Sequence, residues 1–298
     1  MNQNEWLAER FETNRSRLRA VAYRMLGSLA EADDAVQEAW LRLSRSDVES
    51  VDNLEGWLTT VVARLCLDML RSRKSRGEVS LDTHVPEPLV SREDHIPAEH
   101  EVLLADSVGL ALLVVLETLP PAERLAFVLH DMFAIPFDEI ATIVGRTPTT
   151  ARQLASRARR RVQQVPVVPD ADVSVQRKVV DAFLAAARGG DFDALVAVLD
   201  PDIVLRADRG TVPEGASRVV RGARAVASQA LTFSRRADVG PGRIARALVN
   251  GTPGIVSWTA DGQPFSVMGF TIVGGKIVEI DVLGDPARLR RLNLTELS

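Results

Sequence analysis

The chain has 298 residues, with 36 Lys and Arg against 40 Asp and Glu, so its formal net charge is −4. This length predicts two or three domains, and the charge excludes a uniformly basic nucleic-acid binder but not DNA binding through a local patch. Apolar residues make up 46% of the chain and charged residues 26%, which excludes disorder driven by charge and low hydrophobicity.

Other features of the composition indicate the cellular compartment. No apolar run reaches the ~18 residues of a membrane helix, and the N-terminus, with Glu5 and Glu9, is too polar for a signal peptide. A single cysteine, Cys66, excludes a disulfide framework and a cysteine zinc cluster, and we interpret it as a small buried hydrophobe. We therefore expect a cytoplasmic protein without membrane contact, and nothing in the sequence indicates a cofactor.

Helical periodicity dominates residues 1–78, which we predict to form the first domain. Apolar side chains recur three and four positions apart over residues 18–26, 35–43 and 57–70. This spacing gives each segment one apolar face, which predicts amphipathic helices that pack together in a single helical domain.

Charge is concentrated at two places in this domain. Glu31, Asp33, Asp34 and Glu38 form an acidic block. Because no His or Cys accompanies these carboxylates, a docking surface or a solvated helix face is favoured over acid–base or metal chemistry. Residues 64–76 hold five basic residues against one acidic residue, which suits either a nucleic-acid contact or the C-terminal end of an ordinary helix.

The periodic pattern fails over residues 79–106. We predict a linker there, extended at Pro86-Glu87-Pro88. His84, His95 and His100 lie in this segment, and we interpret them as solvated side chains rather than metal ligands.

A helix-turn-helix closes the second predicted domain, residues 107–166. The helices expected there cover residues 108–119, 122–132, 137–144 and 148–163. Gly145 supplies the turn between the last two, Thr147 suits the N-cap, and Pro148 suits the first helical position.

The exposed face of the last of these helices carries side chains that donate to base edges and phosphates. They are Thr149, Thr150, Arg152, Gln153, Ser156, Arg157, Arg159 and Arg160. Six arginines and no carboxylate lie between residues 140 and 168, and this single-signed charge favours DNA binding over a merely solvated basic helix.

After a short linker, residues 167–172, the pattern changes and predicts an α+β domain over residues 173–298. The helices expected there cover residues 175–187, 192–199 and 223–233. The strand-like runs cover residues 203–205, 245–249, 254–259, 265–273 and 276–283. Asp261-Gly262 and Gly274-Gly275 predict hairpin turns. The predicted fold class is therefore multidomain, with two all-α domains followed by an α+β domain.

Two separate motifs resemble bacterial sigma factors. Residues 23–42, Tyr-Arg-Met-Leu-Gly-Ser-Leu-Ala-Glu-Ala-Asp-Asp-Ala-Val-Gln-Glu-Ala-Trp-Leu-Arg, resemble their second conserved region, and residues 56–71 resemble its promoter-reading continuation. Residues 119–131, together with the helix-turn-helix, resemble the fourth region. Since the motifs lie in the right order with a linker between them, the chain is similar to the extracytoplasmic-function class, which has only these two regions.

The resemblance implies a role for each charged segment. Docking on the clamp helices of RNA polymerase core is implied for Asp33, Asp34, Gln37 and Glu38. Recognition and opening of the −10 element are implied for the helix over residues 64–76 with the loop over residues 44–55, by extrusion of a base. The basic residues of that helix are Arg64, Arg71, Arg73, Lys74 and Arg76. The arginine-rich face over residues 149–160 would read the −35 element in the major groove, and the linker would thread through the polymerase.

The α+β domain resembles the SnoaL-like fold, a curled sheet against helices that forms a cone with an apolar pocket. The family includes ketosteroid isomerases and polyketide cyclases, in which an Asp abstracts a proton beside a carbonyl. The candidate pocket residues are the polar Asp208, Asp281 and Arg206 and the lining Trp258, Phe265 and Phe270. No His follows His130 and the single Tyr is Tyr23, so a regulatory role is favoured over a catalytic one.

Sigma factors that carry this domain have further sequence signatures, with which this chain can be compared. They are a Pro-Glu-Pro linker, an Asp-Gly-Gly-Gly-basic loop, from which Asp208-Arg209-Gly210-Thr211 departs, and a terminal motif resembled by Asp285-Pro286-Ala287-Arg288-Leu289. The resemblance implies that the domain contacts the sigma domains and tunes polymerase binding in place of a separate anti-sigma protein. The candidate regulatory and pocket residues are Asp208, Arg209, Gly210, Trp258, Asp281, Asp285 and Pro286.

We therefore predict a transcription initiation factor that binds RNA polymerase core and promoter DNA, with no catalytic residue, no metal site and no cofactor. A small-molecule ligand of the C-terminal domain fits this prediction. Two alternatives stay open from the residues. One is a ligand-responsive regulator that uses the helix-turn-helix without polymerase, and the other is an isomerase or cyclase in the C-terminal domain.

Overall fold

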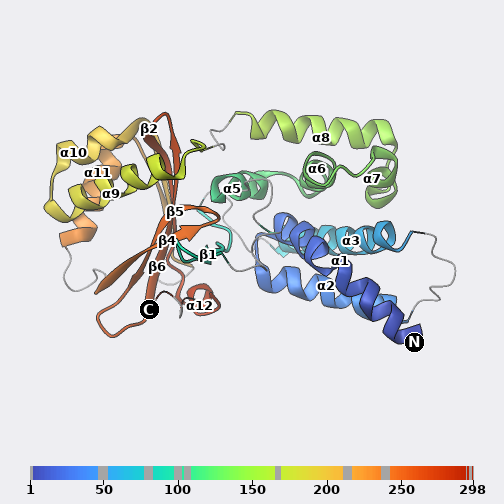
Figure 1. The fold of residues 1–298 in the computed structure, drawn as a ribbon. Coiled ribbons are helices and arrows are strands. Elements are labelled where there is room, and N and C mark those ends of the chain that lie inside the picture. The colour runs from blue at the N-terminus through green and yellow to red at the C-terminus, as the bar shows by residue number, and fades with distance from the viewer. Residues whose placement is uncertain are drawn as a thin grey trace. The chain divides into compact units, whose positions relative to one another are not determined.

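The computed structural model describes residues 3–45, 53–76, 83–96, 103, 109–164, 169–210, 217–235, 242–292, 294 and 297. The chain divides into two compact units. The first unit comprises Met1–Val79, Ala98–Asp106 and Val115–Val165, and the second comprises Ser80–Pro97, Ser107–Val114 and Pro166–Ser298. Helices build the first unit and an α+β fold builds the second, which confirms the predicted fold class (Figure 1).

The first unit begins with the helices α1 (Gln3–Leu26), α2 (Leu29–Leu43) and α3 (Leu54–Arg76). Ser28 caps α2 by accepting the N–H of Glu31. The apolar faces of these helices pack on one another and hold Cys66 fully buried. Burial raises the pKa of the Cys66 thiol well above its usual range, which confirms the predicted buried hydrophobe.

The helix-turn-helix part of the first unit follows. The helix α5 (Leu110–Thr118) leads into it, with residues 110–114 in the second unit and residues 115–118 in the first. The other elements of this part are α6 (Pro121–Phe127), the π-helical turn η2 (Val128–Met132), α7 (Phe137–Val144) and α8 (Pro148–Val162). The single helix predicted over residues 122–132 is thus an α-helix that continues as a π-turn. Ala134 then adopts φ +55° and the N–H of Ile135 donates to the carbonyl of Leu129 at 2.9 Å, so the helix ends before Pro136.

A mixed sheet and helices make up the second unit. In the described residues its strands are β1 (Val90–Ser91), β2 (Leu199–Asp208), β3 (Arg218–Arg221), β4 (Arg243–Val249), β5 (Thr252–Trp258), β6 (Pro264–Val273) and β7 (Lys276–Leu283). They lie in the order β1-β4-β5-β6-β7-β2-β3, and neighbouring strands are antiparallel except for the parallel pair β2 and β7. The predicted hairpin turns join β5 to β6 and β6 to β7.

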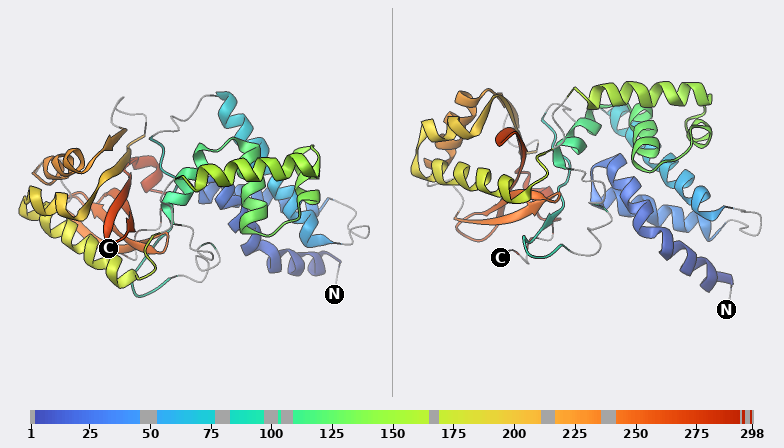
Figure 2. Two further views of the ribbon diagram at one scale, coloured as in Figure 1. Left: turned by 90° about the horizontal axis from the view of Figure 1, so that it is seen from above. Right: turned by 45° about the horizontal axis from the view of Figure 1, so that its top comes forward.

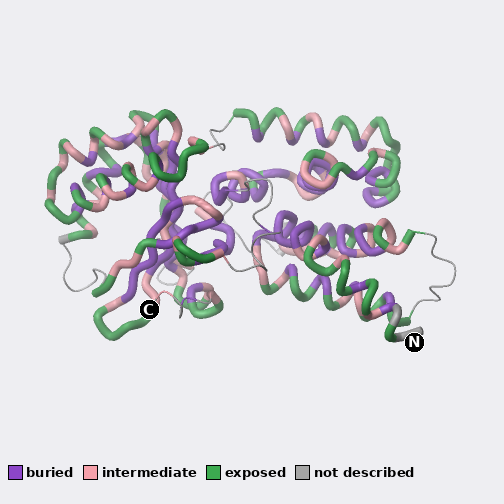
Figure 3. Tube along the Cα trace, in the orientation of Figure 1, coloured by how far each residue is buried: buried purple, intermediate pink, exposed green. Residues whose placement is uncertain are grey.

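Helices cover one side of this sheet. They are α9 (Val173–Gly189), α10 (Phe192–Val198) and α11 (Ala223–Arg235), and α12 (Pro286–Leu289) follows β7 (Figures 1 and 2). Helices and strands share one apolar core, in which Leu195, Ile203, Val226 and Ile272 are fully buried (Figure 3). Among the described residues, no helix is long and apolar enough to cross a membrane.

The segment predicted as a linker over residues 79–106 differs from the prediction at residues 84–91. These residues belong to the second unit, where Val85 and Leu89 are buried and β1 pairs with β4. The neighbouring prolines cannot donate hydrogen bonds, which suits extended chain at a sheet edge. Periodicity could not reveal the pairing, because β1 has only two residues.

Candidate functional site

Helix α8 presents one face to its domain and the other to solvent. Thr147 caps the helix by accepting the N–H of Thr150 at 3.2 Å. Ala151, Ala155 and Ala158 are fully buried, and their small side chains let α8 lie close to α6 and α7. Of the predicted −35 residues, the exposed ones are Thr149, Arg152, Gln153, Arg157 and Arg160, and the half-buried ones are Thr150, Ser156 and Arg159 (Figure 3).

The arginines on this face differ in their contacts. Arg159 is held by Asp131, with 2.6 Å between Nη2 and Oδ1. The Arg152 guanidinium lies 5.2 Å from the centroid of the Phe137 ring. Within the described residues, Arg157 forms no ion pair. Of these three arginines, Arg157 would therefore lose the fewest contacts within the protein when it binds a phosphate or a base edge.

The predicted polymerase-docking residues lie on one surface of α2. Asp33, Asp34 and Gln37 are exposed and Glu38 is half-buried. Arg19 donates to Asp33 at 2.6 Å, and Arg42 donates to Glu38 at 2.9 Å. Asp34 has no such cation in the described part of the chain. The surface is acidic and accessible, as a docking site for a basic partner requires.

The predicted −10 residues on α3 do not form one free face. Arg73 donates to the carbonyl of Leu26 at 3.1 Å and pairs with Glu31, and its side chain is only 20% exposed. Arg64 donates to the carbonyl of Thr142 at 3.3 Å. Arg71, in contrast, is exposed and lies 3.6 Å from Asp68. The side chains of Lys74 and Arg76, and much of the predicted loop over residues 44–55, lie outside the described residues.

A buried arginine that the sequence did not reveal joins the two halves of the first unit. Arg124 of α6 is 4% exposed and donates to the carbonyl of Met25 at 2.7 Å. Its guanidinium lies 3.7 Å from Glu117, and burial lowers the pKa of Arg124. On α1, the guanidinium of Arg24 lies 4.7 Å from the ring centroid of Phe133. The sigma-like helices α1 and α3 therefore pack directly on the helix-turn-helix part.

In the second unit, Asp208 holds the segment that was predicted to be a free linker. Its carboxylate accepts the N–H of Val85 at 3.1 Å and lies 3.2 Å from Nδ1 of His84. Arg288 donates to the same carboxylate at 2.7 Å and to the carbonyl of Val85 at 2.5 Å. We call Asp208, Arg288, His84 and Val85 the Asp208 cluster. The prediction that His84 is a solvated side chain is therefore wrong.

The ionised form of Asp208 is favoured in this cluster. Burial alone would raise the pKa of Asp208, but hydrogen bonds from His84, Val85 and Gly210, together with the charge of Arg288, lower it to about 2. Asp208 is thus a charged anchor at neutral pH, and that charge strengthens its contacts with Arg288, His84 and Val85.

The terminal motif completes the anchor. Asp285 caps α12 by accepting the N–H groups of Ala287 and Arg288, which begins the helix at Pro286 and orients Arg288. Gly210 has φ +75°, and a Cβ there would lie 2.7 Å from the Asp285 carboxylate. The predicted regulatory residues Asp208, Gly210, Asp285 and Pro286 thus meet at the linker.

A second anchor holds Leu89, four residues after Val85. Asn250, which the sequence did not single out, accepts the N–H of Leu89 through its side chain at 3.1 Å and donates its own N–H to the carbonyl of Leu89 at 2.8 Å. Asn250 has φ +50°, a conformation that Asn tolerates better than most residues. Together with the β1–β4 pair, it fixes the backbone of residues 89–91.

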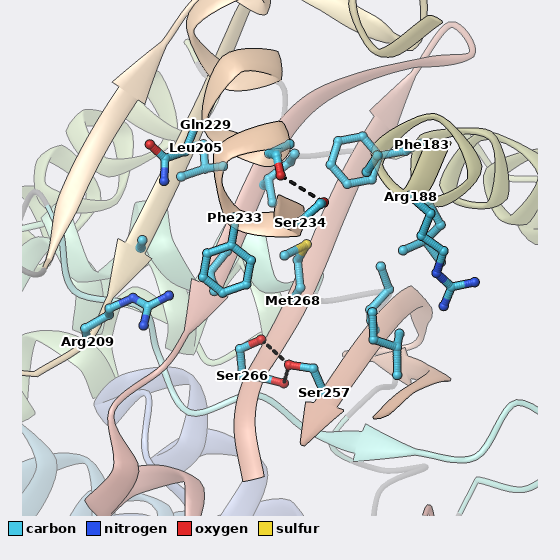
Figure 4. A pocket seen from close by; sticks show the side chains of 18 of the residues that line it. Phe183, Arg188, Leu205, Arg209, Gln229, Phe233, Ser234, Ser257, Ser266 and Met268 are labelled. Carbon is cyan, nitrogen blue, oxygen red and sulfur yellow. Dashed lines mark hydrogen bonds between the residues drawn. The ribbon is translucent and has the colours of Figure 1, made fainter. Parts of the chain in front are cut away.

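The second unit also has a cavity of about 440 Å³, open to solvent on one side, between α9, α11 and the sheet (Figure 4). Along β2 and the residue after it, Leu205, Ala207 and Arg209 line the cavity, so Arg206 and Asp208 point to the opposite side. The prediction that Arg206 and Asp208 are pocket residues is corrected by this alternation, whereas the prediction for Arg209 agrees with the structure.

The same alternation moves Asp281 away from the cavity. Ile280 and Val282 of β7 line it, and Asp281 lies on the other face with its Oδ1 3.3 Å from Nη1 of Arg206. Burial raises the pKa of Asp281 to about 6, although the charge and hydrogen bond of Arg206 oppose this. Glu279 pairs with the same guanidinium. The prediction of Asp281 as a pocket residue is therefore corrected to a buried ion-pair partner.

The predicted aromatic lining is also corrected. Ser257 lines the cavity, while Trp258 lies beyond a register shift between the two residues and packs under Arg243, 4.9 Å from its ring centroid. Phe270 belongs to the core, and Phe265 lies beside Arg209 without lining the cavity. No Asp, Glu, His or Tyr is among the described residues that line the cavity, so none of them supplies the general base that the isomerase alternative needs.

Within the described part of the chain, no group of His, Cys, Asp and Glu could hold a metal ion. His130, whose Nδ1 lies 3.0 Å from the carbonyl of Ile135, stacks on Phe137. His95 forms an isolated bridge with Arg92, and His100 lies outside the described residues.

Comparison with known families matches the chain in three parts. Sigma-70 region 2 matches residues 10–76, Sigma-70 region 4 matches residues 109–162, and a SnoaL-like domain matches residues 180–280. The order and kind of these matches confirm the resemblances found in the sequence.

Two relatives from Mycobacterium tuberculosis are similar along most of their length. The ECF RNA polymerase sigma factor SigJ (strain ATCC 25618 / H37Rv) is 42% identical over 276 residues, which are 91% of this chain and 86% of the relative. The probable ECF RNA polymerase sigma factor SigI (strain CDC 1551 / Oshkosh) is 36% identical over 294 residues, which are 97% of each chain. The crystal structure of SigJ superposes with a TM-score of 0.78 at 35% identity and covers 97% of this chain and 100% of its own.

Proposed function

This chain belongs to the extracytoplasmic-function RNA polymerase sigma factors, and on that premise we propose that its second unit controls initiation by holding residues 84–91. The two sigma-70 matches support promoter-specific transcription initiation, with RNA polymerase core and promoter DNA as the partners that the family implies. The protein then acts in the cytoplasm. It binds polymerase core and promoter DNA and opens the DNA, and it catalyses no covalent step.

The exposed surfaces of the first unit supply the contacts for this function. The acidic surface of α2 docks on the polymerase, the exposed face of α8 reads the −35 element, and Arg71 on α3 contacts DNA at the −10 element. The support is their exposure, together with the complementary charge of a basic partner for α2 and of phosphate for the arginines. Arg73, whose guanidinium is held by Leu26 and Glu31, serves to position the end of α3.

The Asp208 cluster is the observation that supports control of initiation by the second unit. Residues 84–91 lie in the chain between the two sigma regions, in the segment that sigma factors of this class use inside the polymerase. Here the backbone of Val85 is held by Asp208 and Arg288, and that of Leu89 by Asn250. Because polymerase and the second unit compete for one segment, docking must break these contacts, and their free energy opposes it.

This competition gives the second unit the role that a separate anti-sigma protein would otherwise have. The free energy of the Asp208 cluster and of the β1–β4 pair sets how strongly the second unit opposes docking on polymerase. A weaker cluster therefore gives tighter binding to core, and a stronger one gives weaker binding.

The test compares Asp208→Asn with Asp202→Asn in the full chain. Asp202 is an exposed residue of the same strand whose side chain makes no ion pair in the described part of the chain, so it is the matched control. Affinity for core polymerase is measured by fluorescence anisotropy, and transcription is measured from the promoter upstream of the protein's own coding sequence. We expect tighter core binding for Asp208→Asn and no change for Asp202→Asn.

Two outcomes would contradict the proposal separately. Unchanged or weaker core binding by a folded Asp208→Asn variant would refute control through the cluster. Failure of the unaltered chain to start transcription with core at any promoter would refute the assignment of promoter-specific initiation itself.

A further inference from the structure

The cavity of the second unit has the size and the walls of a small-molecule site. Its volume of about 440 Å³ lies within the ~300–1,000 Å³ that such sites span. Phe183, Leu205, Phe233, Ile255 and Met268 contribute to its walls, and Figure 4 shows Phe233 and Met268 on the interior between α11 and the strands. These walls favour an apolar ligand body.

The charged groups that line this cavity all have the same sign. They are Arg188 of α9, Arg209 after β2 and Arg218 of β3, and no carboxylate is among the described residues that line it. Each of these arginines also lacks an ion-pair partner in the part of the chain that the structure describes. Arg209 is half-buried, whereas Arg188 and Arg218 are exposed. Three cations on an apolar cavity, with no anion among its described lining residues, favour a ligand that carries negative charge.

Arg209 is the best placed of the three. Its guanidinium lies 5.3 Å from the ring centroid of Phe233 and 5.2 Å from that of Phe265, so two aromatic rings hold it. It is half-buried, and both this burial and the neighbouring Arg218 lower the pKa of Arg209. Figure 4 shows its guanidinium at one end of the cavity, with Arg188 at the opposite side. An acidic group there would relieve the repulsion between Arg209 and Arg218.

A second polar spot lies on the sheet side of the cavity. The hydroxyls of Ser257 and Ser266 are 2.7 Å apart, and both residues are buried (Figure 4). One hydroxyl donates to the other, so the pair retains a lone pair that can accept a further hydrogen bond. The spot tolerates a polar substituent on the ligand body without supplying a charge.

We propose that this cavity binds an apolar molecule with one acidic group, whose carboxylate meets Arg209 and Arg218 and whose body fills the space between α9, α11 and the sheet. The planar guanidinium of Arg209 suits two-point recognition of a carboxylate. The site also stands next to the Asp208 cluster in the chain, since Arg209 follows Asp208 directly. The proposal concerns binding alone and does not depend on the role in transcription.

The first test compares head groups on one body. The full chain is titrated by calorimetry with decanoate, decan-1-ol and decylammonium below the concentrations at which they form micelles, and in a second series with 2-naphthoate and 2-naphthalenemethanol. We expect the carboxylate to bind at least ten times more tightly than the alcohol in one or both series, and decylammonium to bind most weakly. Absence of carboxylate binding in both series, or an equal or greater affinity for the alcohol or the ammonium, would overturn the proposal.

The second test locates the head group. Arg209→Gln removes the charge and keeps a polar, unbranched side chain, although a shorter one, and it should weaken carboxylate binding at least tenfold while changing alcohol binding by less than twofold. Arg221→Gln is the matched control, because Arg221 is an exposed residue of β3 that does not line the cavity. An unchanged carboxylate preference in a folded Arg209→Gln variant would refute the assigned residue. If that variant does not fold, the head-group comparison on the unaltered chain still decides. Neither titration contains polymerase, so failure here leaves the proposed sigma function untouched.

Discussion

The C-terminal half of α3 and the helix α8 carry similar basic charge, yet the structure places their arginines in different surroundings. On α3, Arg73 is held by the Leu26 carbonyl and by Glu31. On α8, Arg157 is exposed and pairs with no carboxylate in the described residues. The contrast teaches that a count of basic residues measures charge, while the availability of that charge depends on carboxylates and carbonyls from distant parts of the chain.

The largest effect is expected for Arg124 of α6, because this arginine is buried and its contacts are structural. Arg124→Met removes the donor to the Met25 carbonyl and leaves the buried Glu117 without this cation. The free energy of unfolding of the first unit should fall by about 3–5 kcal/mol. Urea unfolding followed by tryptophan fluorescence measures this, because three of the four tryptophans belong to this unit. They are Trp6, Trp40 and Trp57.

Arg15→Met is the control for this prediction. Arg15 lies 3.0 Å from Glu12, but the two side chains are 56% and 59% exposed, so the loss should stay below about 1 kcal/mol. Equal losses for the two variants would show that burial does not separate the arginines of this unit.

The next effect is expected in DNA binding and not in stability. Arg157→Ala removes an exposed cation from the reading face of α8, so the holoenzyme should bind the promoter more weakly by about 1–3 kcal/mol. Urea unfolding should stay within about 0.5 kcal/mol of the unaltered chain. Anisotropy with a labelled promoter fragment measures the binding, with the exposed Arg221→Ala of the second unit as control. Normal affinity would remove Arg157 from the proposed −35 contacts.

Local patterns predicted those elements whose signals lie within a few residues. The cap at Thr147 and the turn at Gly145 placed α7 and α8, and Gly274-Gly275 placed the hairpin between β6 and β7. Periodicity failed where a partner decides the structure, as for the edge strand β1.

The site shows the same limit. The polar residues Arg206, Asp208 and Asp281 were predicted to face a pocket, but strand alternation turns them to the other side, where Arg206 and Asp281 pair. Ile255 and Ser257 of β5 line the cavity, so the same alternation turns Trp258 away from it. Which face of a strand meets the helices depends on the packing of other elements, so a single sequence does not reveal it.

Arg73→Ala tests the α3 side of the comparison and should cost stability. Loss of the hydrogen bond to Leu26 and of the pair with Glu31 should lower the free energy of unfolding of the first unit by about 1–2 kcal/mol. Promoter opening should then fall only as far as the folded fraction falls, which stopped-flow fluorescence of a labelled −10 element measures. Opening that is lost in a fully folded variant would return Arg73 to the DNA-contact set.

The smallest effect on stability is expected two residues earlier, at Arg71. Its side chain is 56% exposed and lies 3.6 Å from an Asp68 that is itself exposed, so Arg71→Ala should change the free energy of unfolding by less than about 0.5 kcal/mol. If Arg71 contacts a phosphate, the slope of log affinity against log salt for the promoter should become shallower by about 1. Salt titrations of holoenzyme binding measure that slope. A fall in stability as large as that of Arg73→Ala, or an unchanged slope, would mean that exposure does not separate DNA-binding from structural arginines on α3. With the expected result, the division seen between α3 and α8 also holds between two residues within a single turn of one helix.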